Sequence, residues 1–352
     1  MTTTTNAPFW ADRLAHAVGA ANVRVADDGD GGRVVVKPGA PAEIVDIVRV
    51  ATEVGALVGV DVPAADSVTL DLSRMHNVLH LDETSLMVAV QAGVTVDALE
   101  QQLAERGLTL GPLPAWSRTR TLGALLAAPR ASEASPRHGR FVNQCAGIAA
   151  ILPDGLEVTT RLAPRKATGP DLMHAILGAR GTLGIITSAT VRVQRRQETR
   201  LEASFRLPSL TAALTAARAL LVRGGRPTEL TVLATGILSL HVDGPEPLVQ
   251  AERALAEAIV REFGGAPVSF APPPRATKPP YERAVALETI DTEVSAPSLV
   301  GDAVRVVGWH VGGACVVDVE RAAAPPAAPH ALWNALKRRL DPDRRFVAWP
   351  GA

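Results

Sequence analysis

Residues 178–187, GARGTLGIIT, carry three glycines within seven positions. Glycine lets the backbone turn sharply and lets a ligand approach main-chain amide and carbonyl groups. The stretch therefore predicts a turn whose backbone groups contact a bound molecule, or a turn that only packs a helix end against a strand. Both alternatives stay open, because the fold needs the turn in either case.

Histidine and cysteine, the usual metal ligands and bases, are scattered along the chain. Cys145 and Cys315 are far apart and fit no metal spacing, so we expect two unpaired thiols in a reducing compartment. Cys145 is expected to be a small buried residue. His76 and His80 are expected at the surface of a hairpin, and His241 is expected to be structural.

The first half of the chain alternates segments typical of strands with segments typical of helices. Apolar residues recur at helical spacing from Pro41, suited to a first turn, to Gly55, suited to a C-cap. A second helix is predicted between Thr95 as N-cap and Gly107 as stop signal. Short apolar runs predict strands at 33–37, 57–60, 68–72, 85–93 and, as a hairpin, 145–159. The mixture predicts an α+β fold.

The composition changes at residues 194–200, QRRQETR, after which a second unit is predicted. Its pattern is strand, helix, two strands and helix, with Ser209 as the cap of the first helix. Residues 271–280, APPPRATKPP, are typical of a linker or surface loop. One or two further strands and a closing helix with a proline-terminated tail complete the chain.

Length and composition restrict the class of protein. The chain has 352 residues, is 47% hydrophobic and has a net charge of +0, which suggests two domains and argues against a broad nucleic-acid surface. The N-terminus lacks the basic start and apolar core of a signal peptide, and no apolar run is long enough to span a membrane. A cytoplasmic protein is therefore expected.

Several motifs occur in one order along the chain. They are DLSRM (71–75), QAGV (91–94), TLGALLAA (121–128), RKATGPDL (165–172), GTLGIIT (181–187) and LDPDRRF (340–346). Together they resemble the FAD-binding domain of the vanillyl-alcohol-oxidase, or PCMH-type, flavoprotein superfamily. The similarity is closest to the glycolate oxidase and D-lactate dehydrogenase branch. The chain length and the motif WHVGGA (309–314) suggest the small E-type subunit of glycolate oxidase.

The resemblance implies a two-subdomain FAD-binding fold with a smaller α+β cap domain for the substrate. The FAD-binding domain would span residues 1–195, completed by about 330–352, and the cap domain residues 196–329. FAD would lie extended between the two subdomains. The family motifs carry cofactor-binding roles over to Pro112, Thr121, Gly123, Ala124, His138, Gly139, Gly184, Ile185 and Thr187.

The pyrophosphate loop departs from the family pattern. The resemblance expects a glycine-rich turn of backbone N–H donors where this chain has DVPAADS, which contains no glycine. Pro63 has no N–H to donate, and Asp61 and Asp66 bring negative charge toward the phosphates. Each missing charged hydrogen bond costs about 1.5–3 kcal/mol, so FAD affinity is expected to fall by orders of magnitude. The degenerate positions are Asp61, Pro63, Ala64, Ala65, Asp66 and Ser67.

Two sets of implied site residues have alternative interpretations. Thr121, Gly123 and Ala124 either line the cofactor channel or form a tight entry to a strand. His138 either replaces a family tyrosine beside the flavin or is an exposed loop histidine.

Oxidation of a 2-hydroxy acid needs a base near the hydroxyl and a cation near the carboxylate. His310 is the best base by position, although a structural strand histidine is the alternative. Related enzymes that use a metal carry a paired-histidine motif, HxGDGNxH, which this chain lacks, so no metal is expected.

These observations leave two main hypotheses and a weaker third. In the first, the chain is an FAD-dependent oxidoreductase for a small 2-hydroxy acid and passes electrons to a partner, a flavoprotein homologue or an iron–sulfur subunit in a hetero-oligomer. In the second, it is a flavin-free pseudo-enzyme that kept the fold as a structural subunit. In the third, it binds a small molecule in the vacated cofactor cleft.

Overall fold

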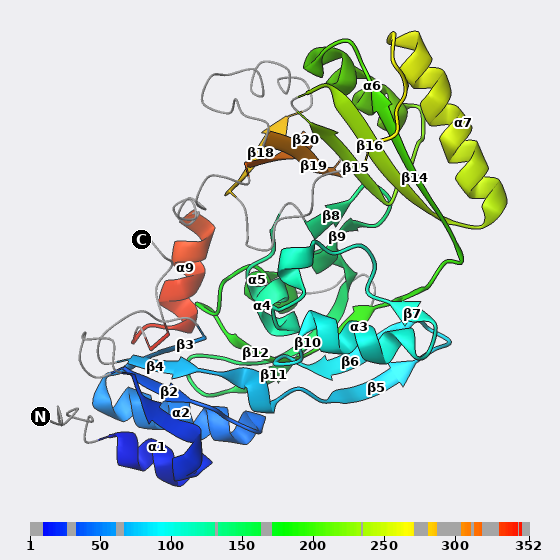
Figure 1. The fold of residues 1–352 in the computed structure, drawn as a ribbon. Helices are drawn as coiled ribbons and strands as arrows, with labels where there is room; N and C mark the ends of the chain where they lie inside the picture. The colour runs from blue at the N-terminus through cyan, green and yellow to red at the C-terminus, as the bar shows by residue number, and fades with distance from the viewer. Residues whose placement is uncertain are drawn as a thin grey trace, which may run out of the picture.

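Two hydrophobic cores organise the chain in a computed structural model (Figure 1). The structure describes residues 10–26, 33–60, 67–130, 133–162, 171–233, 235–270, 281–286, 304–310, 313–318, 331–343 and 345–346. The first core gathers buried side chains between residues 10 and 193 together with Phe346. The second core gathers buried side chains between residues 205 and 260. The α+β class predicted from the sequence is confirmed.

The first unit begins with a small mixed sheet. Its strand order is β1-β2-β4-β3, with β2 and β3 both parallel to β4. The bounds are β1 Val23–Val25, β2 Val34–Val36, β3 Leu57–Gly59 and β4 Ser67–Leu70. Helices α1 (Ala11–Val18) and α2 (Pro41–Val54) pack against each other and this sheet. As predicted, Pro41 opens α2 and Gly55 ends it in the left-handed conformation.

A second, antiparallel sheet follows in the order β11-β10-β12-β6-β5. Its strands are β5 Val78–Asp82, β6 Met87–Gln91, β10 Cys145–Ile151, β11 Glu157–Thr159 and β12 Ile185–Arg192. The helices of this part are α3 Val96–Ala104, α4 Leu122–Ala127 and α5 Leu172–Ile176. Two short pairs complete it: β7 Leu108–Thr109 with β13 Gln194–Arg195, and β8 Ala134–Ser135 with β9 Gly139–Arg140.

The C-terminal segment returns to the first unit. Helix α9 (Ala331–Leu340) leads to Phe346, which is 1% exposed and bridges to Val58 in parallel beside β3. Asp341 is buried, pairs with Lys337 and accepts hydrogen bonds from the amides of Arg345 and Phe346. Because a buried carboxylate needs such partners, this cluster fixes the tail against the first sheet.

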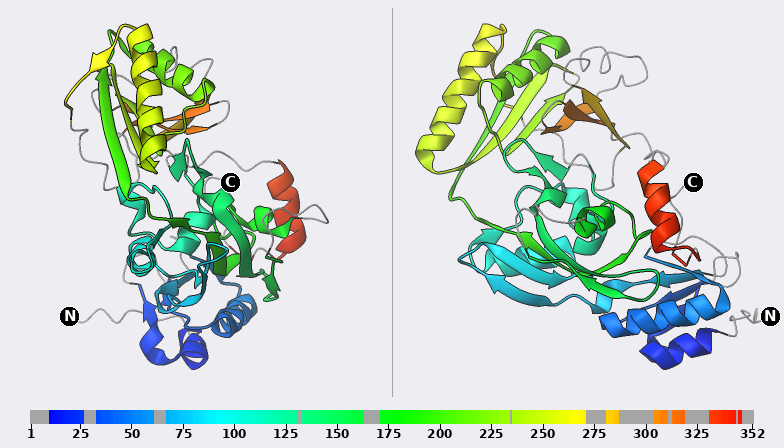
Figure 2. Two further views of the ribbon diagram at one scale, coloured as in Figure 1. Left: turned by 90° about the vertical axis from the view of Figure 1, so that its right-hand side faces the viewer. Right: turned by 180° about the vertical axis from the view of Figure 1, so that it is seen from behind.

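The second unit is a seven-stranded antiparallel sheet with two helices on one face (Figure 2). The order is β17-β14-β16-β15-β19-β20-β18. The bounds are β14 Thr199–Arg206, β15 Glu229–Leu233, β16 Ile237–Gly244, β17 Ala266–Pro267, β18 Tyr281–Ala286, β19 Val304–His310 and β20 Gly313–Asp318, with helices α6 Leu210–Val222 and α7 Glu246–Glu262. Ser209 caps α6 as predicted, accepting from the Ala212 amide.

The hairpin β8–β9 joins the two units. The buried Ser135 hydroxyl donates to the carbonyl of Thr228 at 2.6 Å, and Arg137 donates to the carbonyl of Asp243. Strand β19 also contacts β8. The hairpin belongs to the first unit by sequence, and it fixes one end of the second sheet.

The QAGV turn after β6 is the point where separate segments of the first unit meet. The Ala92 amide donates to Thr187 on β12, the Gly93 amide to Met75, and the Gly123 amide of α4 back to Ala92. A Cβ atom on Gly93 would lie 1.8 Å from the backbone oxygen of Leu72. Only glycine permits this approach.

The structure excludes one of the two alternatives for two sets of residues. Residues 121–128 do not enter a strand: Thr121 caps helix α4 by accepting from the Ala124 amide at 3.2 Å. His138 is half-buried rather than exposed, because it lies between the two units. The expected surface positions of His76 and His80 and the buried position of Cys145 are confirmed. Among the described residues, no helix has the length and apolar character needed to cross a bilayer.

The close approach at Gly93 makes a direct prediction about stability. Gly93→Ala should lower the free energy of unfolding by about 3 kcal/mol or more, because the new methyl group collides with backbone atoms that cannot rotate away. Gly147→Ala is the matched control, since Gly147 is also buried but its nearest neighbours lie 3.6 Å from a Cβ. Its change should stay within about 1 kcal/mol. Urea unfolding measures both, and equal losses in the two variants would contradict the argument.

Candidate functional site

The predicted cofactor-binding residues divide into two groups in the structure. Thr121, Gly123 and Ala124 open helix α4 beside the QAGV turn, and Gly184, Ile185 and Thr187 lie where β12 begins. Pro112 and His138 instead line a cleft at the junction of the two units. Gly139 is exposed at the start of β9, with no atom within 4 Å of a Cβ on it.

The start of α4 is tightly built and its amides are used within the chain. Gly123 packs so closely that a Cβ would lie 2.8 Å from the Ala92 methyl. The Leu122 amide donates to the carbonyl of Val94, and the Gly123 amide donates to the carbonyl of Ala92. The Ala124 amide donates to the Thr121 hydroxyl, and the Leu125 amide donates to the Thr121 carbonyl. The open N–H groups of Leu122, Gly123 and Ala124 are therefore satisfied without a ligand, and Leu125 makes the first bond within the helix.

Thr187 behaves differently from its neighbours. The register between β10 and β12 shifts between Ala149 and Ala150, and Thr187 is the unpaired extra residue of this bulge. Its side-chain hydroxyl is buried, at 1% exposure, and has no hydrogen-bond partner in the structure. A buried, unpaired hydroxyl costs about 1–3 kcal/mol, so this atom is the best candidate in the first group for contact with a bound molecule.

The second group belongs to a cleft of about 690 Å³ between the two units. One wall comes from residues 109–113 and 194–200 of the first unit and its connection to the second. The other wall comes from the β8–β9 hairpin and the ends of β15 and β16. The charged lining residues are Glu100, Arg118, Arg137, Arg195, Arg196, Glu198, Arg200, Glu229 and Asp243.

Two titratable groups in this cleft have perturbed pKa values. Burial, reinforced by the Arg137 guanidinium, lowers the pKa of His138 from 6.5, and Asp243 only partly opposes this. Burial raises the pKa of Glu100, although the Leu110 amide and the Thr109 hydroxyl both donate to its carboxylate. At neutral pH the histidine is therefore uncharged and can accept a proton.

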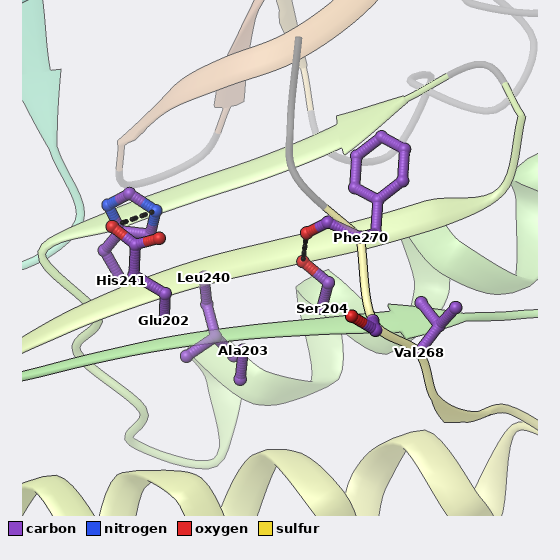
Figure 3. Close-up of a pocket in the computed structure, with 8 residues that line it drawn as sticks. Glu202, Ala203, Ser204, Leu240, His241, Val268 and Phe270 are labelled. Carbon is purple, nitrogen blue, oxygen red and sulfur yellow. Dashed lines mark hydrogen bonds and ion pairs between the residues drawn. The ribbon is translucent and has the colours of Figure 1, made fainter.

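A smaller pocket of about 250 Å³ lies on the face of the second sheet (Figure 3). At one end, His241 Nε2 lies 3.6 Å from the Glu202 carboxylate. At the other end, the Ser204 hydroxyl points toward the Phe270 carbonyl at 3.5 Å and lies 2.8 Å from the Ser239 hydroxyl. Arg200 also donates to His241 Nδ1, so this histidine is fully engaged, as the structural interpretation predicts.

Several predicted positions lie outside the described part of the chain. The loop residues Asp61, Pro63, Ala64, Ala65 and Asp66 are among these, whereas Ser67 begins β4 and is buried. His310 ends strand β19, and its side chain is outside the description. No group of three potential metal ligands is found in the described ranges.

Several residues that define the site could not be named from the sequence. Glu100 lies in helix α3, Arg195 ends the two-residue strand β13, and Arg137 and Arg196 lie in connections without periodicity. Arg120 is also unexpected: its guanidinium bonds buried Glu133 at 2.8 Å and the carbonyls of Ala124 and Ala128 around α4. Their importance depends on contacts between distant segments.

Comparison with known proteins identifies a domain match and a shared fold. Residues 32–161 match the family described as an FAD binding domain. An alkyldihydroxyacetonephosphate synthase structure covers 95% of this chain and 84% of its own, with a TM-score of 0.73 at 17% identity. p-Cresol methylhydroxylase covers 95% and 85%, with a TM-score of 0.69 at 12% identity. Part of the chain thus matches an FAD binding domain, and the chain shares the PCMH-type fold of these solved structures.

The curated relatives match this chain over only part of their own length. An FAD-linked oxidoreductase of Escherichia coli, YgcU, is 30% identical over 171 residues, 48% of this chain and 35% of that protein. The mitochondrial D-lactate dehydrogenase [cytochrome] 1 of Saccharomyces cerevisiae is 35% identical over 144 residues, 40% of this chain and 24% of that protein. The chain thus covers about a third or less of these relatives' own length.

The described residues fit FAD in part. The bulge at Thr187 offers an open hydroxyl, and the small residues Gly123 and Ala124 keep side-chain volume low beside it. The amides of α4 do not fit a diphosphate, because all four are already paired. These four amides of the described chain therefore offer no donor to a diphosphate.

Thr187 can be tested without measuring activity. Thr187→Val replaces a buried unpaired hydroxyl by a methyl group of similar size, so the free energy of unfolding should stay equal or rise by about 1 kcal/mol. FAD affinity should fall about three- to tenfold if the hydroxyl bonds the cofactor. Urea unfolding and an FAD fluorescence titration measure the two effects.

Thr182→Val is the matched control for this substitution. Thr182 is also buried, but its hydroxyl donates to the carbonyl of Ala179, so its loss should destabilise the protein by about 1 kcal/mol. If both valine variants destabilise equally, the Thr187 hydroxyl has a partner and the argument fails.

The lowered pKa of His138 predicts a pH dependence of stability. Between the folded-state pKa and 6.5, the unfolded chain holds more protons at this histidine than the folded chain. The contribution of His138 to stability therefore falls as the pH drops through this window. The difference in unfolding free energy between wild type and His138→Gln should shift against the wild type from pH 7.5 to pH 5.

Arg137 tests the cause of this dependence. In an Arg137→Gln background, the pH-dependent difference should shrink, because the Arg137 charge no longer adds to the effect of burial on the His138 pKa. A difference that is flat with pH in the wild-type background would contradict the assignment.

Proposed function

We propose that this chain is a subunit of an FAD-linked dehydrogenase or oxidase that acts on a small 2-hydroxy acid such as lactate or glycolate. The observation that carries the proposal is the match to the FAD binding domain family over residues 32–161, together with the partial similarity to a D-lactate dehydrogenase. The two-unit architecture supports it, since a junction between units is a common place for a substrate site.

The first unit would hold the cofactor. Gly123, Ala124, Gly184, Ile185 and Thr187 would line it, with the Thr187 hydroxyl as the side-chain contact. When bound, FAD supplies a two-electron acceptor for the hydrogen on the substrate carbon. The chain's own residues bind and orient the acid and remove its hydroxyl proton.

Two histidines are the candidates for the base. His310 ends strand β19, and His138 lies in the hairpin that includes β8, a strand in contact with β19. We propose His310 as the base. His138 is the next candidate, because its lowered pKa keeps the imidazole in the proton-accepting form at neutral pH.

The electrons would then leave to a partner. The proposal includes a second subunit, a flavoprotein homologue or an iron–sulfur protein, because the sequence motifs resemble those of a glycolate oxidase subunit. The complex would be a hetero-oligomer.

A flavin-free structural subunit is the second candidate function. One geometric observation favours it: the amides of Leu122, Gly123, Ala124 and Leu125 at the start of α4 all donate to groups within the chain. The sequence DVPAADS, with a proline and two aspartates in place of glycines, supports the same conclusion. In this case the fold would serve as a scaffold for an active partner.

The absorbance spectrum of the purified protein, followed by titration with FAD, separates the two functions. A flavin-dependent enzyme should be yellow, with the flavin absorbance at roughly 450 nm, or should bind added FAD. It should also reduce a dye with D-lactate or glycolate, and His310→Gln should lower kcat at least about a hundredfold.

The opposite result supports the structural subunit. A colourless protein that ignores added FAD, both alone and after co-expression with a flavoprotein homologue, would rule out the redox proposal. FAD binding with unchanged turnover in His310→Gln would keep the cofactor and reject this base.

A further inference from the structure

Three arginines in the cleft between the two units lie outside the close ion pairs of the described chain. Arg137, Arg195 and Arg196 all line the cleft, and none forms an ion pair with any residue in the described ranges. The other two cleft arginines are engaged, Arg118 with Asp97 and Arg200 with Asp243 and His241. The unpaired cations come from two different walls, the hairpin and the connection between the units.

The carboxylates of the cleft balance these cations only in part. Asp243 pairs with Arg200, and Glu229 lies 3.6 Å from His241. Glu100 and Glu198 form no ion pair in the described chain; Glu100 accepts from the Leu110 amide at 2.7 Å and from Thr109, and burial raises its pKa although the charges of Arg118 and Arg196 act against this. Three guanidinium groups without an ion pair thus face two such carboxylates, which leaves an excess of positive charge.

Arg137 is placed to recognise a ligand. Arg137 is half-buried, and its guanidinium donates a hydrogen bond to the carbonyl of Asp243. A guanidinium has five N–H donors, so this bond orients the group and leaves donors unused. A partly buried cation without a counter-ion is costly, and a bound anion would remove that cost.

Arg195 and Arg196 have a fixed backbone. Arg195 pairs in register with Leu108 between β13 and β7, and the Arg196 amide donates to the carbonyl of Gly107 at 2.8 Å. Their side chains are exposed at the cleft, so they can reach an anion without disturbing the fold. Two adjacent arginines and a third across the cleft suit a group with several oxygens.

We propose that this cleft binds a small molecule through a carboxylate or phosphate group held by Arg137, Arg195 and Arg196. The volume of about 690 Å³ exceeds what one anionic group fills, so the ligand has a polar body that Thr109, Gln194 and Thr228 can contact. The site does not depend on FAD, and it exists in a flavin-dependent enzyme and in a flavin-free subunit alike. Uncharged His138 beside it can donate or accept one further hydrogen bond.

Calorimetric titration of the full chain at constant ionic strength tests the proposal. The probes are inorganic phosphate, glycerol phosphate, D-lactate and succinate, so that phosphate and carboxylate sources are compared directly. We expect saturable binding of one class, and Arg195→Gln/Arg196→Gln should weaken it at least tenfold. Arg137→Gln should weaken it by a similar factor.

The control removes the same charge elsewhere. Arg24→Gln/Arg192→Gln changes two exposed arginines outside the cleft lining and should leave the affinity within about twofold, as expected for distant exposed charges screened by salt. Equal weakening in both double variants would mean a general charge effect and would overturn the proposal. No binding of any probe at millimolar concentration would overturn it as well.

FAD serves as the competitor that separates this site from the cofactor site. If the protein binds FAD, probe binding should be unchanged in its presence. Displacement of the probe by FAD would assign the arginines to the cofactor and reject a separate site. Probe binding by a protein that fails to bind FAD would support the anion site while rejecting the redox function.

Discussion

The approach of Gly93 to the backbone oxygen of Leu72 is the constraint on which the first unit depends. A Cβ at this position would lie 1.8 Å from that oxygen, so the turn after β6 exists only with glycine. The turn receives or donates hydrogen bonds that hold the start of α4, the strand β12 and the segment ending at Met75. One small residue therefore sets the relative positions of the segments in which the family motifs place the cofactor.

This construction has a consequence for function. The amides of residues 122–125 at the start of α4 all donate within the chain, two of them to the turn after β6. These bonds hold the helix start in place, and the same amides are then not free to bind an anion. A diphosphate needs several aimed N–H groups, which leaves that task to other parts of the chain. The bulge at Thr187 is the exception, because there a polar atom remains buried and unpaired.

The sequence predicted the regular elements well and the junction poorly. Helices with clear apolar spacing and caps appear where they were expected. Examples are the helix that begins at Pro41 and the helices capped by Thr95 and Ser209. For the segment 121–128 the sequence left a strand entry open as one of two alternatives, since its short apolar run has no period that separates a helix from a strand; the structure shows a helix.

The candidate site was only partly predictable for a related reason. Motif residues such as Gly123 and Thr187 are local and could be named from the chain. The cleft residues Arg137, Arg195 and Arg196 come from connections with no periodicity, and they are brought together only by tertiary contacts. For His138 an exposed loop position was one of two alternatives, and the burial that lowers its pKa arises only at the junction of the units.

The junction itself links the two candidate functions. Ser135 and Arg137 bond the carbonyls of Thr228 and Asp243, so one hairpin both connects the units and carries the half-buried guanidinium of the cleft. A molecule that binds this guanidinium together with residues of β15 or β16 contacts both units and therefore favours the joined arrangement. These hairpin contacts involve none of the residues of the predicted pyrophosphate loop, so the joined arrangement and cofactor binding rest on different parts of the chain.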